Sequence, residues 1–336
     1  MKKKIGILGS TGSIGNNTIE IILNNKKDFD VIFLSTNTNV KKLLSQSLIL
    51  KPKSVIIFDK KKYIKYKKKF INKKIKVFNT FKDLKKNSLK MKIDYIMCAI
   101  TGLAGLDSTI NCIDSTKTVA IANKESIICA WNLIEKKLIK NKTKFIPVDS
   151  EHFSIWSLLQ HESIYNVEKV FITASGGPFL NYKLNKLKNV KPKDAIKHPN
   201  WSMGKKISID SATLMNKVFE VIEAQRIFKI DINKFEILIH PSSYIHSIIK
   251  FNNGQIKILA HETDMKIPIF NSIYQHGLKK IKTKNININL LNNLKLMKIN
   301  SYKYPSTKIL NKISNINSLF ETVLISSNDE LVELYI

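Results

Sequence analysis

The sequence has almost no arginine and an excess of charge of one sign. Arg226 is the only arginine among 56 basic residues, which face 26 acidic ones and give a formal net charge of +30. Proteins that read nucleic-acid sequence rely on arginine for bidentate contacts to bases. We therefore interpret the excess of lysine, which accompanies abundant isoleucine and asparagine, as mutational drift, with a polyanion partner as the alternative. A positive field of this kind would attract phosphorylated substrates.

The scarcity of cysteine and of long apolar runs argues against two further classes. Cys98, Cys112 and Cys129 lack CxxC spacing, which excludes a disulfide framework or a zinc knuckle and favours a reducing compartment. No stretch of about 18 uncharged apolar residues occurs, so we expect no membrane span. The lysines at 2–4 resemble the start of a secretory signal, but residues 6–17 are too rich in Gly, Ser and Asn for its apolar core. We expect a cytoplasmic protein without a targeting segment.

The hydrophobic pattern changes near residue 150. Before it, short apolar runs alternate with helical patterns, which predicts an α/β fold with a doubly wound, Rossmann-like parallel sheet. After it, strand-like runs, long loops and one strong helix over 212–229 predict an α+β domain, and Asn253-Gly254 predicts a hairpin turn. The six runs of the first half are 5–9, 31–35, 54–59, 95–100, 118–123 and 145–149, and those of the second half are 167–174, 235–240, 246–251 and 255–260.

A glycine-rich loop follows the first predicted strand and opens a predicted helix. Gly9, Gly12 and Gly15 give the spacing GxxGxxG rather than GxGxxG. Glycines at such a place allow a tight turn and let a pyrophosphate approach the N-terminus of the helix. We interpret the loop as a dinucleotide-binding site, with a merely structural loop as the alternative.

Two polar segments follow later strands, at the sheet edge where ligands bind in this kind of fold. Lys124 could bind a substrate oxygen, although a solvated strand end would also explain it. Asp149 and Glu151 are two residues apart, so an extended chain would point both carboxylates the same way. Like charges this close need a cation or a shared proton, and oxygen ligands favour Mg²⁺ or Mn²⁺. The alternative is two solvated acids in a loop.

The strong helix carries a third set of polar groups. Asp210 or Ser211 can cap it. Asn216, Lys217 and Glu220 share one helical face, so Glu220 could complete a metal site of three carboxylates. An ordinary Lys–Glu surface pair is the alternative.

Two loops complete the candidate site. Residues 174–178 offer hydroxyl and backbone N–H donors to an anion. Residues 198–204 carry Trp201 and Met203 between a proline and a glycine, which predicts a lid that excludes water when closed. The alternative is a structural loop with Trp201 in the core.

Together these segments resemble one family, the 1-deoxy-D-xylulose 5-phosphate reductoisomerases. The similarity rests on GSTGSIG, ANKES, PVDSEH, ASGGPF, HPNWSMGKKISIDSATLMNK, IHPSSYIHS and ETDMKIPI, in this order. The resemblance implies an NADP-dependent oxidoreductase that converts 1-deoxy-D-xylulose 5-phosphate to 2-C-methyl-D-erythritol 4-phosphate in the non-mevalonate pathway of isoprenoid biosynthesis. It implies NADPH and Mg²⁺ or Mn²⁺ as cofactors, with a metal-assisted rearrangement of the carbon skeleton followed by hydride reduction.

The resemblance also implies a role for each matching residue. The residues that would bind NADPH are Thr11, Gly12, Ser13, Ile14, Asn39, Asn123, Glu125 and Gly204. The metal ligands would be Asp149, Glu151 and Glu220. The substrate would be bound by Lys124, Ser150, Glu151, Ser175, His198, Ser211, Asn216, Lys217 and Glu220, of which Lys124 and Glu151 would be catalytic. Trp201 and Met203 would lie on the lid.

The sequence departs from the family pattern in three places, one of which is the replacement of the usual Gly and Pro just before Asp264 by His261 and Thr263. Residues 37–39 are Asn-Thr-Asn, where the family usually has a glycine and a basic residue near the 2′-phosphate of NADPH. Lys41 or Lys42 could supply the missing charge, and we expect NADPH to be preferred over NADH by a reduced margin. The family's C-terminal helical domain is represented only by its beginning, so we expect a shortened domain, either natural or in an incomplete chain.

We expect four segments and few partners. The segments are a dinucleotide-binding domain over 1–149, a catalytic and connective α+β domain with the metal site and lid over 150–276, a linker over 277–305 and a truncated helical domain over 306–336. The expected partners are a small phosphorylated sugar and a second copy of the chain in a homodimer, with neither nucleic acid nor membrane.

Overall fold

The computed structural model describes residues 2–89, 91–201, 204–275 and 277–336. Within these ranges, no helix combines the length and apolar character that crossing a membrane requires. The chain divides into two compact units, one formed by Met1–Asp149 with Pro268–Leu278, the other by Ser150–Ile267 with Lys279–Ile336. The division into four segments stays a prediction.

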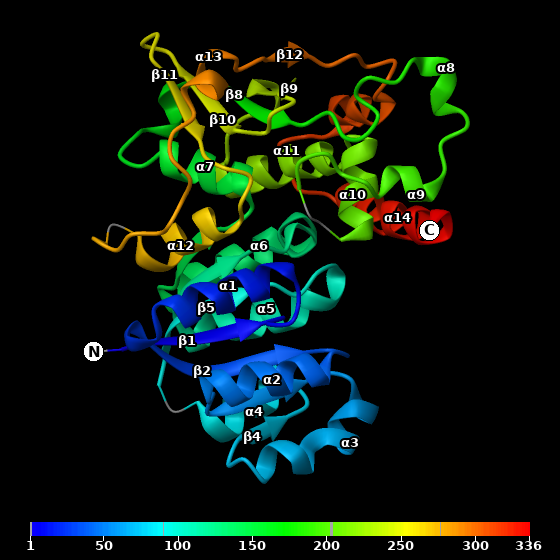
Figure 1. The fold of residues 1–336 in the computed structure, drawn as a ribbon. Coiled ribbons are helices and arrows are strands. Elements are labelled where there is room, and N and C mark those ends of the chain that lie inside the picture. The colour runs from blue at the N-terminus through cyan, green and yellow to red at the C-terminus, as the bar shows by residue number, and fades with distance from the viewer. Residues whose placement is uncertain (1, 90, 202–203, 276) are drawn as a thin grey trace. The chain divides into compact units, whose positions relative to one another are not determined.

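The first unit is built on a parallel sheet (Figure 1). In the described residues it has seven strands in the order β4-β3-β2-β1-β5-β6-β7, and all of their pairings are parallel. The strand order reverses at β1, and right-handed crossovers from such an order place helices on both faces, as in a doubly wound fold. The strands are β1 Lys3–Leu8, β2 Phe29–Thr36, β3 Ser54–Ile57, β4 Lys76–Phe78, β5 Ile93–Cys98, β6 Thr116–Ile121 and β7 Lys144–Pro147.

This sheet confirms the predicted α/β fold class and adds one strand to the six expected. β4 went unnoticed because it has only three residues, follows a lysine-rich stretch and shows no continuous apolar run. The helices associated with the sheet follow the 3.6-residue period; α1, for example, buries Gly15, Thr18, Ile19 and Ile22. The helices are α1 Ser13–Asn24, α2 Val40–Leu50, α3 Lys60–Ile71, α4 Phe81–Ser88, α5 Leu106–Cys112, α6 Lys124–Asn141 and α12 Lys266–Tyr274.

The second unit contains a mixed sheet with the strand order β11-β10-β8-β9-β12. β8 and β9 are parallel, and the other neighbours are antiparallel. Gly254 has φ +84° in the turn between β10 and β11, which confirms the predicted hairpin. The strands are β8 Val167–Ala174, β9 Phe235–Ile239, β10 Ile245–Phe251, β11 Ile256–Ala260 and β12 Met297–Lys298. The expected linker thus contributes β12, which pairs with β9.

The helix predicted over 212–229 corresponds to α11, Met215–Phe228, whereas Ala212 is the last residue of α10. Leu214 adopts the left-handed conformation, with φ +59°, and separates α10 from α11. The prediction that Asp210 or Ser211 caps the helix was wrong, because both residues lie inside α10. A left-handed leucine leaves no sequence signal, since no glycine or proline marks the break. The helices of this unit are α7 Ser150–Leu158, α8 Leu184–Leu187, α9 Pro192–Ala195, α10 Lys205–Ala212, α11 Met215–Phe228, α13 Ile288–Asn292 and α14 Phe320–Tyr335, with a 3₁₀ helix η6 at Pro305–Lys312.

Candidate functional site

The glycine-rich loop joins β1 to α1 in the first unit. Gly9 has φ +84°, and a Cβ there would lie 2.6 Å from the backbone oxygen of Ala99. A Cβ on Gly15 would lie 2.2 Å from the backbone oxygen of Gly9, so helix and loop pack too closely for a side chain. Gly12 and Ser13 are exposed, and no side chain in the described structure caps α1. The first amides of α1 are therefore open to an anion.

The loop after β2 carries the position where a basic residue is missing. Asn39 caps α2, its side-chain oxygen accepting from the amide of Lys42 at 3.2 Å. Lys41 and Lys42, the replacements considered from the sequence, are both exposed. The ammonium of Lys62, at the start of α3, donates to the backbone oxygen of Thr38 at 2.9 Å. A lysine therefore contacts this loop from 24 residues further along the chain.

The segment after β6 holds its polar side chains at the start of α6. Asn123 caps the helix, accepting from the amide of Ser126 at 2.7 Å, and its amide group donates to the backbone oxygen of Gly102 at 2.7 Å. Lys124 is buried, with its ammonium 3.0 Å from the carboxylate of Asp149. Glu125 is also buried, in the first turn of α6. The segment thus forms a fixed polar edge at the carboxyl end of the parallel sheet.

The geometry expected for Asp149 and Glu151 was wrong. The chain is not extended here, because α7 begins at Ser150 and places Glu151 in its first turn. A carboxylate is stabilised at this end of a helix by the backbone dipole. Asp149 directly precedes the helix and is the last residue of the first unit.

Lys217 joins two buried carboxylates in the second unit. Its ammonium donates to Glu151 on α7 and, at 2.7 Å, to Glu220 on its own helix α11. Glu151 also accepts from the hydroxyl of Ser150 at 2.7 Å, and the amide of Asn216 donates to Glu220. The predicted shared face of Asn216, Lys217 and Glu220 is confirmed, but it is buried rather than a surface ion pair.

These charges shift each other's pKa values. Burial by itself would raise the pKa of Glu151, but the neighbouring Lys217 ammonium and the hydrogen bonds hold it well below its usual range. Burial by itself would lower the pKa of Lys217, but the two carboxylates raise it. Both groups are therefore charged at neutral pH.

His152 supports the arrangement, since its Nε2 donates to the backbone oxygen of Glu220 at 2.8 Å and ties α7 to α11.

The hydrogen bonds around His198 fix its tautomer. Its Nδ1 accepts from the amides of Asn200 at 3.1 Å and Trp201 at 2.9 Å. Burial and the charge of Lys217 lower the pKa of His198 to about 4, so the ring is neutral at pH 7 and its proton sits on Nε2. Nε2 then donates to the hydroxyl oxygen of Ser175, 3.0 Å away.

Ser175 is thereby oriented as a hydrogen-bond donor. Its oxygen accepts from His198 and from the amide of Gly177, which lies 3.0 Å away. Both lone pairs are used, so the hydroxyl hydrogen points to a third partner. Gly177 in turn packs against α10, because a Cβ there would lie 2.7 Å from the backbone oxygen of Ser211. The loop 174–178 offers an oriented hydroxyl to an acceptor such as a phosphate oxygen.

The expected lid is described only in part. Met203 lies outside the described residues. Trp201 is half-buried, with its ring 6.1 Å from that of His246 in an edge-on arrangement. Gly204 is exposed and caps α10. The closing motion of residues 198–204 stays a prediction.

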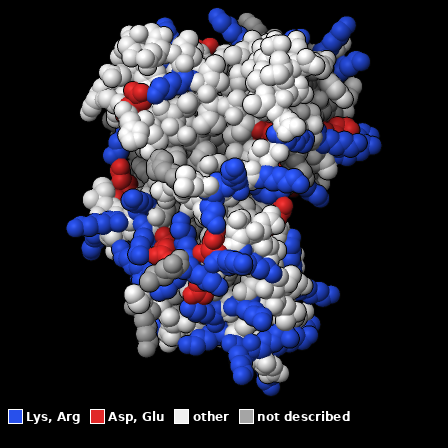
Figure 2. All heavy atoms as spheres, turned by 60° about the vertical axis from the view of Figure 1, so that its left-hand side comes forward, with Lys and Arg blue, Asp and Glu red and all other residues white. Residues whose placement is uncertain are grey.

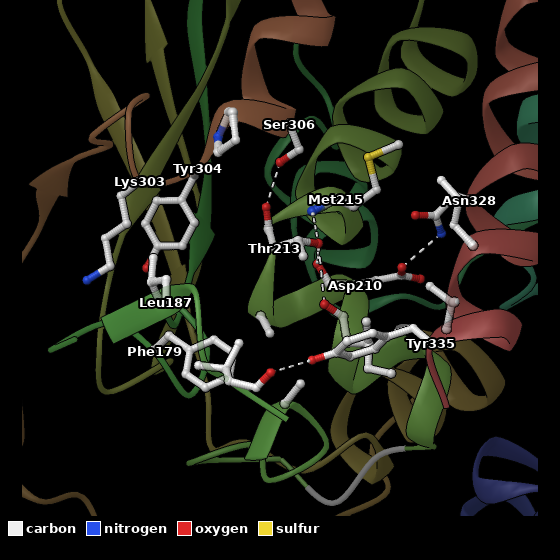
Figure 3. A pocket seen from close by; sticks show the side chains of 17 residues that line it. Phe179, Leu187, Asp210, Thr213, Met215, Lys303, Tyr304, Ser306, Asn328 and Tyr335 are labelled. Carbon is white, nitrogen blue, oxygen red and sulfur yellow. Dashed lines mark hydrogen bonds between the residues drawn. The ribbon is translucent and has the colours of Figure 1, made fainter. Parts of the chain in front are cut away.

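The second unit also holds an apolar cavity of about 510 Å³ (Figure 3). It is bordered by α10, η6 and α14, and Phe179, Met215 and Tyr304 line it. Asp210 at its wall accepts from the side chain of Asn328 at 2.8 Å. Neither Glu151 nor Lys217 is among its described lining residues. The polar site therefore lies elsewhere in this unit.

The residues fit the two cofactors that the sequence motifs suggest. Glu151 and Glu220 hold a positive charge between them and offer only oxygen ligands, which suits Mg²⁺ or Mn²⁺. Asp149, directly before α7 in the sequence, carries a further carboxylate. The uncapped N-terminus of α1 suits a pyrophosphate.

Two residues that support the candidate site, Lys62 and His152, were not predicted from the sequence. Lys62 reaches the loop after β2 only because β3 lies beside β2 in the sheet, a relationship that no local motif encodes. The bond from His152 to α11 likewise depends on tertiary packing. The neighbouring sequence PVDSEH could have drawn attention to His152, but nothing local marks Lys62 among the surrounding lysines.

Comparison with known proteins gives one consistent result. A family model described as 1-deoxy-D-xylulose 5-phosphate reductoisomerase matches residues 5–131, and one for the C-terminal domain of the same enzyme matches residues 145–228. A 1-deoxy-D-xylulose 5-phosphate reductoisomerase of Pelagibacter ubique is 57% identical over 99% of this chain and 86% of its own length.

Solved structures agree. The enzyme of this name from Zymomonas mobilis, in complex with NADPH, superposes with a TM-score of 0.91 at 32% identity over 100% of this chain and 87% of its own. A reductoisomerase in complex with NADPH, fosmidomycin and magnesium gives a TM-score of 0.90 at 30% identity, over 99% of this chain and 84% of its own.

Proposed function

The chain belongs to the 1-deoxy-D-xylulose 5-phosphate reductoisomerase family, and we propose how its residues divide the work of that reaction. It is an NADP-dependent oxidoreductase of isoprenoid precursor biosynthesis. It converts 1-deoxy-D-xylulose 5-phosphate to 2-C-methyl-D-erythritol 4-phosphate with NADPH and a divalent metal ion, Mg²⁺ or Mn²⁺.

The first unit binds the coenzyme in this proposal. The open amides at the start of α1 bind the pyrophosphate, which supports roles for Thr11, Gly12, Ser13 and Ile14. When bound, NADPH supplies the hydride for the reduction. Further coenzyme contacts in this unit come from residues after β2 and β6, namely Asn39, Asn123 and Glu125. Gly204, at the start of α10 in the second unit, is assigned to the coenzyme from the family resemblance alone.

The metal ligands are Asp149, Glu151 and Glu220. This assignment is supported by Glu151 and Glu220, because both carboxylates are buried and both bind the same ammonium. When bound there, a divalent cation supplies Lewis-acid polarisation of carbonyl and hydroxyl oxygens. Glu151 stays ionised for this task, because the neighbouring Lys217 ammonium holds its pKa well below its usual range.

The substrate is held by groups that donate hydrogen bonds and carry positive charge. Ser175, oriented by His198, donates its hydroxyl hydrogen to a phosphate oxygen. Lys217 supplies charge beside it, as its effect on the pKa of His198 indicates. The remaining substrate residues are Lys124, Ser150, Ser211 and Asn216. Lys124, like Glu151, acts at the reacting oxygens, and the lid with Trp201 keeps water away.

Three finer points belong to the same proposal. The chain acts in the cytoplasm, which the free state of Cys98, Cys112 and Cys129 supports. It forms a homodimer, as expected for the family. It binds no nucleic acid, which the spread of lysine along the sequence supports, and acidic side chains lie among the basic ones visible in Figure 2.

The observation that carries the role assignment is the ammonium of Lys217 between Glu151 and Glu220. It is tested with Glu220→Gln, which should lower turnover by several orders of magnitude and weaken Mn²⁺ binding measured by electron paramagnetic resonance. Glu168→Gln, at an exposed carboxylate paired with Lys250, is the matched control and should change neither. Near-normal turnover and Mn²⁺ affinity of Glu220→Gln would remove Glu220 from the metal site.

A further inference from the structure

We propose that Lys62 selects NADPH over NADH by binding the 2′-phosphate of the coenzyme, an inference that rests on the coenzyme site proposed for the first unit. The sequence lacks the basic residue expected at 37–39, yet the structure brings a lysine to this loop from the following helix. Lys62 is thus a specificity-determining residue that the local motif does not contain.

The sheet brings the two segments together. β2 and β3 are parallel neighbours, with Thr36 in register with Ile57. The pairing continues beyond β3, since the amide of Phe58 donates to the backbone oxygen of Thr36 at 3.0 Å. The chain after β3 therefore runs beside the loop after β2, and α3 starts at its edge.

Lys62 is held in place in a way its neighbours are not. Asp59 caps α3 by accepting from the amide of Lys62 at 2.8 Å, which fixes the first turn of the helix. Lys60 and Lys61 are exposed, whereas Lys62 is half-buried. Its ammonium donates to Thr38, and an ammonium has three donors, so within the described residues two of them are left for another acceptor.

The position matches the chemistry of the 2′-phosphate. In dinucleotide-binding folds, the chain after the second strand meets the adenosine ribose, where an acid binds a 2′-hydroxyl and a basic residue accommodates a 2′-phosphate. Residues 35–42 contain no acid that would favour NADH. Lys62, anchored to the backbone of Thr38 in that loop, meets this requirement for positive charge.

The test compares binding of coenzymes to the whole chain, without substrate. Equilibrium fluorescence titrations give Kd for NADPH, for NADH and for adenosine 2′,5′-bisphosphate, a probe that carries the 2′-phosphate without the nicotinamide. Lys62→Gln should weaken NADPH and the bisphosphate by about ten- to a hundredfold and leave NADH unchanged, because a charge-assisted hydrogen bond is lost. Lys61→Gln, the exposed neighbour, is the matched control and should bind all three like the wild type.

The possible outcomes distinguish the role of Lys62 from the existence of the coenzyme site in the first unit. An equal loss of NADPH and NADH in Lys62→Gln would show a structural role for the lysine and overturn the proposal, as would an unchanged ratio of the two Kd values. Lys62→Arg should retain the preference, since it keeps the charge. If the wild type binds neither coenzyme, the coenzyme site itself is wrong and the inference about Lys62 falls with it.

Discussion

Lys217 and Glu220 lie one helical turn apart on α11, with the ammonium 2.7 Å from a carboxylate oxygen and both side chains buried. The same ammonium binds Glu151 on α7, so one positive charge holds two carboxylates from two helices. A lone Lys–Glu pair of this spacing on a helix surface would contribute a few tenths of a kcal/mol. Burial changes the balance, because removing the ammonium would leave buried carboxylates without their charge partner.

Loss of Lys217 should therefore be costly and should be offset by metal. Lys217→Gln leaves two buried carboxylates without their ammonium and should lower the free energy of unfolding by about 3–5 kcal/mol. Adding Mg²⁺ or Mn²⁺ should recover part of this loss, since the cation replaces the ammonium. Denaturant unfolding with and without metal measures both effects. Lys250→Gln, in an exposed pair, is the control and should cost at most about 1 kcal/mol. A loss in Lys217→Gln that metal does not reduce would contradict a cation site here.

Stability should fall as the pH is lowered from about 6.5 toward 4. The pKa of His198 is lowered to about 4 and that of His246 to about 3, in both cases mainly by burial. In this window the unfolded chain takes up protons that the folded chain does not, so acid favours unfolding. Glu151, whose pKa is lowered, adds a loss only below the usual glutamate range. In His198→Gln, the free energy of unfolding should depend less steeply on pH between about 6.5 and 4. An unchanged slope in that variant would mean that His198 titrates alike in both states.

The hydroxyl of Ser175 should matter for the phosphate and not for the coenzyme. Ser175→Ala removes the donor that His198 and Gly177 orient, and should raise the KM for the sugar phosphate by about ten- to a hundredfold. The Kd for NADPH should stay the same. Steady-state kinetics and a coenzyme titration check the two halves. A change confined to NADPH binding would mean that Ser175 contacts the coenzyme, and would contradict its role at the substrate phosphate.

The positive charge should not translate into specific nucleic-acid binding. Binding to duplex DNA at physiological salt should fall in the non-specific range of about 10⁻⁴–10⁻⁶ M. Fluorescence anisotropy with DNA of two unrelated sequences measures it. Nanomolar binding that differs between the sequences would revive the interpretation of the lysine excess as an interface.

The sequence was most informative where function and local pattern coincide. The glycine loop, the face shared by Lys217 and Glu220 and the alternation of strands and helices all follow from spacing along the chain. The break at Leu214 did not, because a left-handed leucine is chosen by its surroundings. Glu151 was expected in an extended chain, since its role was argued from an alternation that the start of α7 overrides. The role of Lys62 could not be predicted from the sequence, because its contact with Thr38 requires the pairing of β2 with β3.

The most direct test is a spectrophotometric assay of the purified chain with 1-deoxy-D-xylulose 5-phosphate, NADPH and Mg²⁺ or Mn²⁺. We expect NADPH to be oxidised in the complete mixture and not when either the sugar phosphate or the metal is left out, with one 2-C-methyl-D-erythritol 4-phosphate formed for each NADPH consumed. A folded chain that binds NADPH and Mn²⁺ but oxidises no NADPH in the complete mixture would contradict it.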